Sequence, residues 1–292
     1  MSKVKKIYSI GIDVGGTKMS AVLFDGNNLI ADYVLATPTD DLDHFMVMLK
    51  ALIKPLEERA RDDKVKIRGI GLGIAGTIDY HEGIMLSSRN IPIIKGVKIA
   101  NKLEEIASLP VAMDNDANCF VRAEVAHGAG QKYKNVFGVI IGTGIGGGWW
   151  INNEVYRGVH GGAGEPGKII VDFKTGLGLE DAYHKLTQDN PAKMAEEAFR
   201  GDKLAQEAFR EVGRNIGIAL AGIVNIIDPE IFVIGGGAVE SSGLFLSEMK
   251  KAMREHVGSN ESKKKIKIVK SKIGPQAGAI GAALLVNMDH GS

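Results

Sequence analysis

Glycine residues gather directly after short apolar runs, and this placement constrains the fold of the chain more than any other feature. The chain holds 38 glycines in 292 residues, about twice the average share in globular proteins. A glycine at the end of a strand lets backbone amides approach another group closely. The glycines therefore predict tight turns at strand ends rather than a flexible linker, and their clusters occupy 11–16, 69–76, 142–148, 158–167 and 235–237.

Composition and charge exclude several classes of protein. With 24% charged residues and a formal net charge of +1, the chain has globular composition and lacks the basic excess of proteins that bind nucleic acids or anionic membranes. Its single cysteine, Cys119, excludes an intramolecular disulfide and a cysteine-cluster metal site. The longest apolar run, 216–227, is shorter than the roughly 20 residues that span a bilayer. We expect a cytoplasmic protein without a signal peptide, a nucleic-acid partner or a membrane partner.

Apolar periodicity predicts an α/β chain with mixed sheets. A helix over 42–60 is preceded by the possible capping residues Asp40 and Asp41. The long helix predicted over 202–227 carries an apolar face that begins at Leu204. Strands are predicted at 7–12, 21–24, 29–35, 67–72, 111–113, 136–141, 148–151, 231–234 and 266–269, and further helices at 97–107, 117–126, 244–256 and 275–286.

The two halves of the chain share a local pattern. Residues 12–28 run as strand, Gly/Thr turn, second strand and polar turn, and residues 141–153 repeat that order. A second echo relates 71–77 to 234–239. No solenoid period accompanies these echoes, so they indicate an ancient duplication. Two such hairpin loops facing one another would clamp a triphosphate between two lobes.

Two glycine motifs match nucleotide-binding fingerprints without the context that those fingerprints need. Residues 142–147 fit G-x-G-x-x-G, but the following 149–153 read as strand and hairpin instead of a helix. Residues 162–168 fit the start of a P-loop, but Ile169 stands where a Ser or Thr must bind Mg²⁺, and Pro166 lacks an amide proton. These contexts argue against a P-loop and against a nicotinamide-dependent oxidoreductase.

The turn that starts at Asp13 combines a carboxylate with glycines. Asp13 ends a buried-looking strand and precedes Gly15, Gly16 and Thr17, so a metal-organising anion would lie beside exposed backbone amides. The competing interpretation is an aspartate that merely caps a turn. Lys18 adds a cation, or is a solvated turn lysine.

A second polar turn, 114–118, follows a short strand and opens a helix. Its two carboxylates and two amides can bind hydroxyl groups, and one carboxylate beside an alcohol can act as a general base. Helix capping accounts for one of the four residues. Glu165 in a glycine loop could be a surface charge, Glu180 suits a helix N-terminus, and Asn90 could be a turn residue.

In order and spacing, six motifs resemble those of the ROK (repressor, open reading frame, kinase) sugar kinases across about residues 7 to 286. The resemblance implies the two-lobed, ribonuclease-H-like fold of hexokinase and actin, with mixed sheets and a central cleft. We expect 1–113 with 275–292 to form the small lobe and 114–274 the large one. The motifs are 13–18, 73–76, 115–118, 142–148, 164–167 and 235–237.

The resemblance implies an ATP- and Mg²⁺-dependent hexose kinase that forms a homodimer. Asp116 matches the general base that accepts the proton of the sugar 6-hydroxyl, and Asp13 would help to place Mg²⁺, mainly through water. The implied sugar-binding residues are Asn115, Glu165, Asn90, Gly76, Glu180 and Lys168. The implied ATP-binding residues are Asp13, Gly15, Gly16, Thr17, Lys18, Gly142, Thr143, Gly144, Gly146, Gly235, Gly236 and Gly237.

The chain departs from the family at Lys168, which replaces a histidine that most members use for a structural zinc ion and for sugar contact. Residues 168–180 also contain no cysteine. We therefore expect no structural zinc and a loop held by packing. Glucose is the favoured substrate, and the alternatives are N-acetylmannosamine, N-acetylglucosamine and fructose.

Two functions of other classes compete with the kinase. A sugar-sensing repressor of the same family would carry a helix-turn-helix module before the first phosphate loop. Here that loop already begins at Asp13, so we expect no such module. A nucleotide-binding scaffold without transfer activity would not require the Asn115–Asp116 pair. ATP is the expected donor, while a preference for ADP or polyphosphate would leave little trace in the sequence.

Overall fold

The computed structural model describes residues 7–287, which divide into two compact units. Within the described residues, unit 1 comprises 7–128, 157–162 and 276–287, and unit 2 comprises 129–156 and 163–275. This division differs from the boundary expected at residue 113. Helix α3 (Asp116–His127) belongs to unit 1 because it packs against helix α9 (Ala277–Ala283) and strand β4 (Lys66–Ile74) of that unit.

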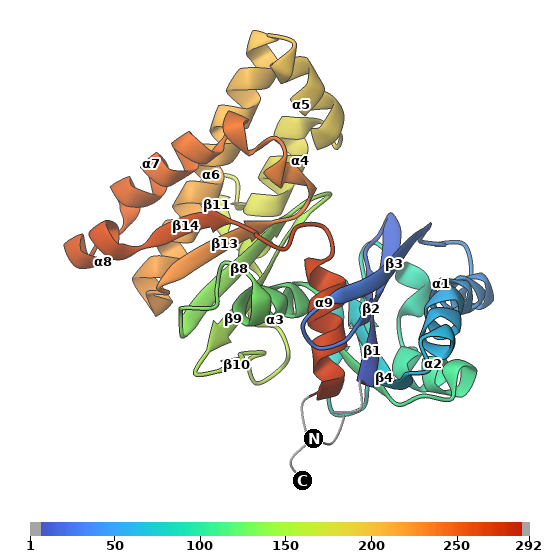
Figure 1. The fold of residues 1–292 in the computed structure, drawn as a ribbon. Coiled ribbons are helices and arrows are strands. Elements are labelled where there is room, and N and C mark those ends of the chain that lie inside the picture. The colour runs from blue at the N-terminus through green and yellow to red at the C-terminus, as the bar shows by residue number, and fades with distance from the viewer. Residues whose placement is uncertain (1–6, 288–292) are drawn as a thin grey trace. The chain divides into compact units, whose positions relative to one another are not determined.

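Unit 1 is built on a five-stranded mixed sheet with the strand order β3-β2-β1-β4-β7 (Figure 1). Strands β1, β2 and β3 form an antiparallel meander, and β4 and β7 continue the sheet parallel to β1. A short antiparallel pair, β5 and β6, follows β4. The bounds are β1 (Ile7–Val14), β2 (Lys18–Phe24), β3 (Leu29–Ala36), β4 (Lys66–Ile74), β5 (Thr77–Asp79), β6 (Ile84–Ser87) and β7 (Val111–Asn115).

Short-range signals mark the start of one helix of unit 1 and the end of another. Asp41 caps α1 (Leu42–Asp62) by accepting a hydrogen bond from the amide of His44 at 2.8 Å, as expected for an N-cap aspartate. Helix α2 (Ile99–Ala107) ends at Ser108 in the left-handed conformation. Short 3₁₀ turns cover Pro92–Ile94 (η1) and Leu284–Asn287 (η5).

Helix α9 lies so close to its neighbours that only glycine fits at the points of contact. A Cβ on Gly11 of β1 would lie 1.9 Å from a backbone oxygen of α9, and one on Gly71 of β4 would lie 1.7 Å from another. A Cβ on Gly281 of α9 would lie 1.7 Å from the carbonyl oxygen of Cys119 in α3. In Figure 1, α9 lies between α3 and β1. Backbone therefore packs directly on backbone along this helix.

Unit 2 repeats the sheet topology of unit 1. Its five strands have the order β10-β9-β8-β13-β14, with β8, β9 and β10 antiparallel and β13 and β14 parallel to β8. This equivalence confirms the internal repeat that the sequence indicates. The bounds are β8 (Asn135–Ile141), β9 (Ile145–Ile151), β10 (Glu154–Val155), β13 (Ile231–Gly235) and β14 (Lys267–Lys270), and a separate hairpin joins β11 (Ile170–Asp172) to β12 (Leu177–Gly178).

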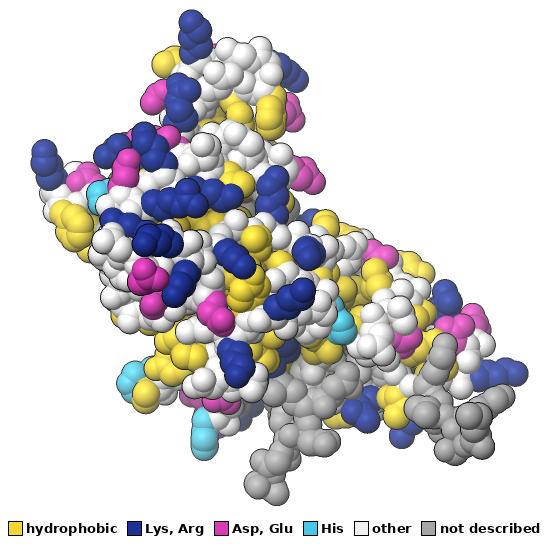
Figure 2. Space-filling view, turned by 60° about the vertical axis from the view of Figure 1, so that its left-hand side comes forward, with side chains coloured by type: hydrophobic (Ala, Val, Ile, Leu, Met, Phe, Trp, Pro, Cys, Tyr) yellow, Lys and Arg dark blue, Asp and Glu magenta, His cyan; other side chains and the backbone are white. Residues whose placement is uncertain are grey.

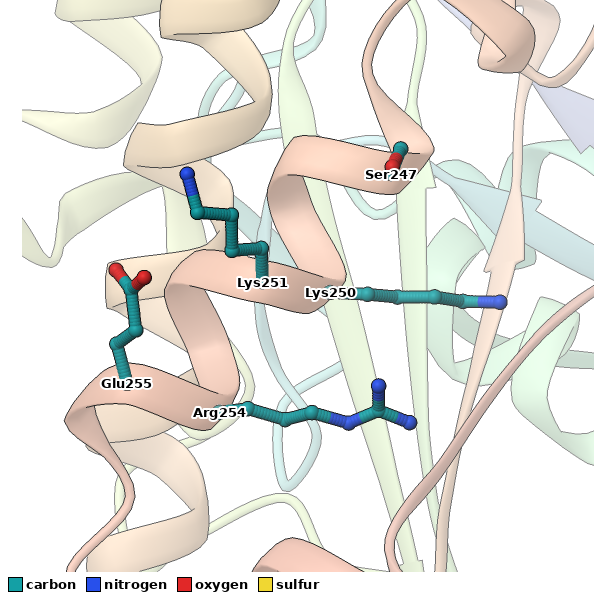
Figure 3. Close-up of a pocket in the computed structure, with 5 residues that line it drawn as sticks. All are labelled: Ser247, Lys250, Lys251, Arg254 and Glu255. Atoms are coloured by element: carbon teal, nitrogen blue, oxygen red, sulfur yellow. The ribbon is translucent and has the colours of Figure 1, made fainter.

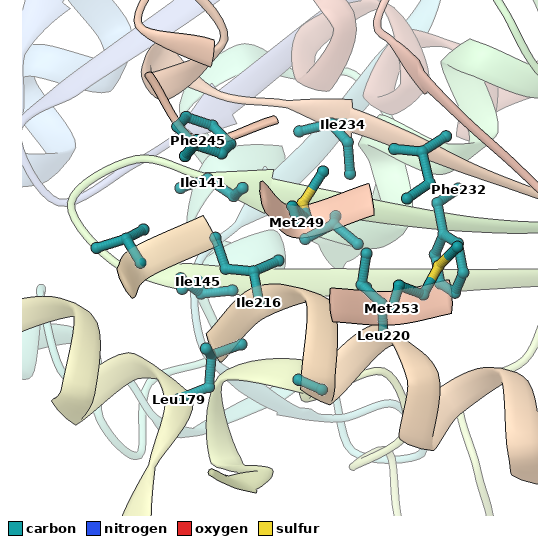
Figure 4. Packing of buried hydrophobic residues seen from close by; sticks show 14 of the residues in the cluster. Ile141, Ile145, Leu179, Ile216, Leu220, Phe232, Ile234, Phe245, Met249 and Met253 are labelled. Atoms are coloured by element: carbon teal, nitrogen blue, oxygen red, sulfur yellow. The ribbon is translucent and has the colours of Figure 1, made fainter. Parts of the chain in front are cut away.

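The helices of unit 2 enclose its main core. Helices α6 (Lys203–Ile227) and α7 (Leu246–His256) pack against one another and bury side chains against β8 and β13. Figure 4 shows Ile216 and Leu220 of α6 beside Met249 and Met253 of α7. The other helices and 3₁₀ turns are α4 (Leu179–Thr187), α5 (Pro191–Phe199), α8 (Asn260–Lys265), η2 (Pro166–Lys168), η3 (Gly237–Val239) and η4 (Ser242–Leu244).

The prediction that the apolar face of α6 begins at Leu204 is wrong. Leu204 is 83% exposed, whereas Ala205 and Phe209 are buried. Leu204 is the second residue of the helix, after the capping residue Asp202 and Lys203. It is not part of the hydrophobic core of unit 2. Between residues 7 and 287, no helix is long and apolar enough to cross a membrane.

The close packing of α9 leads to a matched pair of glycine substitutions. Gly281→Ala should lower stability by about 2 kcal/mol or more, because an added methyl group in a filled site forces backbone shifts. Gly222→Ala, in the interior of α6 where a Cβ meets nothing within 4 Å, should be neutral or stabilising by up to ~1 kcal/mol. Thermal unfolding of both variants checks this, and equal midpoints would contradict the packing role of Gly281.

Candidate functional site

The turn after β1 is held in shape by its own backbone and by one hydroxyl group. The amide of Gly15 donates to the carbonyl oxygen of Lys18 at 3.0 Å. The Thr37 hydroxyl donates to the carbonyl oxygen of Gly15 at 2.8 Å. Thr17 and Lys18 are exposed. The predicted first phosphate loop is thus an ordered β1–β2 turn with exposed side chains at its tip.

Two of the predicted sugar-binding residues of unit 1 contact other predicted positions. Asn90 packs so closely on Gly16 that a Cβ on this glycine would lie 2.5 Å from the Cβ of Asn90. Asn115 donates from Nδ2 to the carbonyl oxygen of Gly76 at 2.9 Å. Gly76 has a φ of +138°, and a Cβ there would lie 2.2 Å from the carbonyl oxygen of Ser87. The structure therefore places Asn90 against Gly16 and Asn115 against Gly76.

Asn115 also caps helix α3. Its Oδ1 accepts from the amides of Ala117 at 2.9 Å and Asn118 at 3.4 Å, so the capping interpretation is correct for this residue. Capping uses both lone pairs of Oδ1, and the bond to Gly76 uses one of the two Nδ2 protons. The second Nδ2 proton remains, so Asn115 can hold the turn and still donate a hydrogen bond to a hydroxyl oxygen.

The interpretation of the whole 114–118 turn as a hydroxyl-binding group is wrong for Asp114 and Asn118. Both side chains are buried, and Asn118 donates from Nδ2 to Asp114 at 2.9 Å. Asp114 also accepts from Arg122 and Arg157. Burial opposes the charged form of Asp114, but hydrogen bonding and charge from Arg157, with help from Asn118 and Arg122, hold its pKa below the usual value. Asn115 and Asp116 remain the candidates for ligand binding in this turn.

Asp13 and Asp116 form an acidic pair in unit 1. Burial and the nearby Asp116 carboxylate raise the pKa of Asp13 to about 7, while Lys18 opposes this shift. Gly278 of α9 makes room for Asp13, since a Cβ there would lie 2.3 Å from its Oδ2. Two neighbouring carboxylates that repel one another suit an oxygen-ligated divalent cation.

In unit 2, the predicted second phosphate loop is the turn between β8 and β9. The amide of Gly142 donates to the carbonyl oxygen of Gly144 at 2.9 Å, and the Tyr183 hydroxyl donates to the carbonyl oxygen of Gly142 at 3.0 Å. A Cβ on Gly144 would lie 2.3 Å from Oε1 of Glu180. Thr143 lies at the tip of the turn. The turn is followed by strand β9, which pairs antiparallel with β8 and with β10, so the strand and hairpin predicted after this motif are confirmed.

The Gly235–Gly237 run lies at the end of the strand next to this turn. Gly235 pairs with Ile140 in the parallel β13–β8 ladder. Gly236 has a φ of +86°, and a Cβ there would lie 2.3 Å from the carbonyl oxygen of Ile141. Position 236 therefore requires glycine, both for its backbone conformation and for its close contact with β8. The predicted adenosine-side loop and the second phosphate loop share one end of the sheet.

The predicted sugar-side residues of unit 2 surround the N-terminus of α4. Lys168 Nζ lies 3.0 Å from Oε2 of Glu180, and the Glu180 side chain is 16% exposed. Burial raises the pKa of Glu165, with Glu180 adding to the shift and Lys168 opposing it. The loop between Lys168 and Glu180 folds into the β11–β12 hairpin, and the amide of Leu179 donates to Ile169 at 2.8 Å.

Four residues that contact the predicted positions belong to no recognisable motif, and three of them leave no signal in the sequence. Tyr80 and Arg157 lie in irregular segments, and Tyr183 has the spacing of an ordinary core residue in α4. Arg122 alone leaves a signal, because it follows Asn118 and Asp114 by four and eight residues in the sequence. A charged residue on the buried face of a helix must be paired, and Arg122 pairs with Asp114 at 3.2 Å.

Comparison with known proteins identifies the family. The ROK family model matches residues 9–289. This chain belongs to the ROK family. An N-acetylgalactosamine kinase of Shewanella is 30% identical over 94% of this chain and 95% of its own length. A glucokinase of Streptomyces griseus, solved with glucose and AMPPNP, superposes with a TM-score of 0.79 at 27% identity over 95% of this chain and 98% of that one.

ROK proteins include regulators as well as kinases. A xylose repressor of Caldicellulosiruptor bescii is 26% identical, over 96% of this chain and 78% of the repressor. The solved ROK structures share the mixed α/β, actin/hexokinase-like fold of this chain. The expected fold class is therefore confirmed, while family membership alone leaves both functions open.

A surface hollow on unit 2 holds none of the predicted site residues of this ROK chain. Lys and Arg side chains gather over unit 2 on the face drawn in Figure 2, and the hollow is lined by one helix, α7. In Figure 3, Lys250 and Arg254 extend to one side of the helix, and Lys251 and Glu255 to the other. Groups from a single exposed helix face do not converge on one point, so this hollow lacks the geometry of a catalytic site.

Among residues 7–287, one cluster of possible metal ligands combines Asp40, Asp41 and His44, all exposed. Asp41 caps α1 and Asp40 lies 2.8 Å from His44 Nδ1. Helix capping and local pairing explain the cluster, so it carries no metal argument.

The acidic pair of unit 1 leads to a prediction about pH and stability. A carboxyl group with a folded pKa of about 7 and an unfolded value near 3.8 destabilises the fold progressively as pH rises between those values. Asp13→Asn removes that cost. We expect it to raise the thermal midpoint of the nucleotide-free protein at pH 8, and by less at pH 5.

Differential scanning fluorimetry in the presence of EDTA measures this difference. Asp32→Asn, at an exposed position of β3, serves as the control and should shift the midpoint equally at both pH values. A gain for Asp13→Asn that is no larger at pH 8 than at pH 5 would contradict the acidic pair.

Proposed function

We propose that the chain is an ATP-dependent sugar kinase that transfers the γ-phosphoryl group to the 6-hydroxyl of a hexose. The observation that carries this proposal is the acidic pair of Asp13 and Asp116. Asn115, the residue before Asp116, is fixed by its bonds to Gly76 and to the start of α3. Membership in a family whose similar members include sugar kinases supports it.

In this proposal Asp116 accepts the proton of the sugar 6-hydroxyl as that oxygen attacks the γ-phosphorus. Phosphoryl transfer requires positioning and charge stabilisation more than covalent chemistry, so a carboxylate within hydrogen-bond reach of the hydroxyl is sufficient as the base. Asn115 would donate to a neighbouring hydroxyl oxygen from the Nδ2 proton that does not bond to Gly76. Asn90 and Gly76 would complete the sugar side of unit 1.

Asp13 would help to hold Mg²⁺, mainly through water. When bound, Mg²⁺ neutralises charge on the phosphate oxygens. The raised pKa of Asp13 fits this role, because a cation beside the two carboxylates would relieve their repulsion. Gly15, Gly16, Thr17 and Lys18 would surround the phosphates with amides and one ammonium group.

Unit 2 would supply the other binding groups. Glu165, Lys168 and Glu180 would bind sugar hydroxyls, and the glycine turns of β8–β9 and β13 would bind ATP. We also infer that the segment 168–180 needs no structural zinc, since the Lys168–Glu180 pair and the β11–β12 hairpin hold it. The remaining predicted nucleotide residues of this unit are Gly142, Thr143, Gly144, Gly146, Gly235, Gly236 and Gly237.

Glucose is the substrate that we favour, and N-acetylhexosamines and fructose are the alternatives within the same reaction. The glucose-bound Streptomyces relative and the N-acetylgalactosamine kinase of Shewanella support this range. A non-catalytic sugar-sensing regulator is the second candidate, because a xylose repressor is among the relatives. We also propose that the protein is cytoplasmic and forms a homodimer.

An ADP-release assay with ATP and Mg²⁺ distinguishes these functions. The panel would contain glucose, mannose, fructose, glucosamine, N-acetylglucosamine, N-acetylmannosamine and allose. We expect sugar-dependent release with one or two of them, above the rate without sugar. No release across the panel, while the protein still binds sugar, would contradict the kinase and favour the regulator.

Substitution of the proposed base tests the mechanism. Asp116→Asn should lower kcat by about 10²-fold or more, the usual contribution of a general base, while ATP binding stays near normal. Steady-state kinetics and calorimetric titration with ATP measure the two effects. Asp32→Asn is the matched control, and unchanged turnover in Asp116→Asn would remove Asp116 from this role.

A further inference from the structure

The Asp114 carboxylate in unit 1 receives an unusually large number of donors. Oδ1 accepts from the Tyr80 hydroxyl at 2.9 Å, Asn118 Nδ2 at 2.9 Å and the amide of Asn115 at 2.8 Å. Arg157 spans both oxygens, with Nε 3.3 Å from Oδ1 and Nη2 2.5 Å from Oδ2. A bidentate guanidinium fixes a carboxylate in direction as well as in place.

Arg157 reaches Asp114 from a different part of the chain. Residues 157–162 belong to unit 1, although the residues on both sides belong to unit 2. The guanidinium carbon lies 4.9 Å from the centre of the Tyr80 ring, a cation–π contact. Gly161 packs on the same surface, where a Cβ would lie 3.0 Å from the carbonyl oxygen of Ile78. Arg157 therefore anchors this segment to unit 1.

The bond between Arg157 and Asp114 affects the proposed site because Asp114 directly precedes Asn115 and Asp116 in the chain. Asp114 is the residue before Asn115, and its side chain accepts the Asn115 amide. Asn115 in turn caps α3 and bonds to Gly76, and Asp116 is the first residue of α3. Fixing the Asp114 side chain thus fixes the backbone that presents Asn115 and Asp116.

We propose that Arg157 is a positioning residue that aligns the Asn115–Asp116 turn for phosphoryl transfer through its bidentate bond to Asp114. This inference rests on the proposed function. Arg122 cannot replace Arg157, because it belongs to α3 itself and cannot tie the turn to another segment. The segment that Arg157 anchors is also continuous in the chain with the predicted sugar loop of unit 2, which contains Glu165.

Arg157 is suitable for substitution because its side chain is 36% exposed. Arg157→Met keeps most of the volume and removes all donors, and Arg157→Lys keeps the charge without the bidentate geometry. Arg254→Met, on the exposed face of α7, is the matched control. Hydrogen exchange of the amides of residues 114–118 measures how often the turn opens. Steady-state kinetics with the accepted sugar measure kcat and the KM for ATP.

In Arg157→Met we expect exchange of these amides to rise about tenfold or more, because the turn opens more often. We expect kcat to fall by about tenfold or more through misplacement of Asp116, with KM for ATP within about twofold of the parent. Arg157→Lys should fall between the parent and the Met variant, and Arg254→Met should match the parent in both measurements.

Unchanged exchange, or faster exchange with unchanged kcat, would overturn the positioning role. A parent protein that phosphorylates no sugar would refute the proposed function instead. A fall in kcat accompanied by an equal rise in KM for ATP would also overturn the inference, because it would indicate general damage to unit 1.

Discussion

The contact of α9 with its neighbours is the constraint on which the candidate site depends. Backbone meets backbone where Gly11, Gly71 and Gly281 leave no room for a side chain. Asp13 is the penultimate residue of β1, and α3 begins with Asp116, so drawing both elements onto one helix brings the two carboxylates within electrostatic reach. The unusual glycine content of the chain therefore has a direct role in the geometry of unit 1.

The three aspartates of this unit differ in their electrostatic surroundings. Asp114 is paired with Arg122 and Arg157 and held ionised in the interior. Asp13 and Asp116 instead repel one another, and burial together with this repulsion raises the pKa of Asp13 to about 7. Perturbed carboxyl groups of this kind are typical of functional sites. Asp114 and Asp116, two residues apart in one turn, therefore have different electrostatic surroundings.

Local signals in the sequence were sufficient for most of the fold. Alternation and turn residues predicted the antiparallel hairpin that opens each large sheet, and the repeated strand-turn-strand pattern predicted the common topology of the two sheets. Capping predicted the start of α1 at Asp40 or Asp41, and the structure shows Asp41 as the cap. Leu204 shows the limit of periodicity, because burial at a helix end depends on which element covers it. The short α5 and α8 were not predicted, although the capping side chains Asn190 and Ser259 stand at their starts.

The site was less predictable than the fold, because its geometry depends on contacts between distant residues. The motifs indicated Asp13, Asn115 and Asp116, but nothing in 114–118 distinguished the buried Asp114 from the others. Arg157 contacts Asp114 across 43 residues of sequence, a separation at which no local pattern carries information. The ion pair of Lys168 with Glu180 likewise became visible only once the hairpin between them was folded.

The most direct test of the kinase proposal is a crystal structure with the accepted sugar and a non-hydrolysable ATP analogue. We predict that the sugar 6-hydroxyl lies within hydrogen-bond reach of the Asp116 carboxylate, roughly 2.6–3.2 Å between oxygens, and is directed at the γ-phosphorus. A sugar bound with its 6-hydroxyl away from Asp116, or with no phosphate near that hydroxyl, would contradict the proposal.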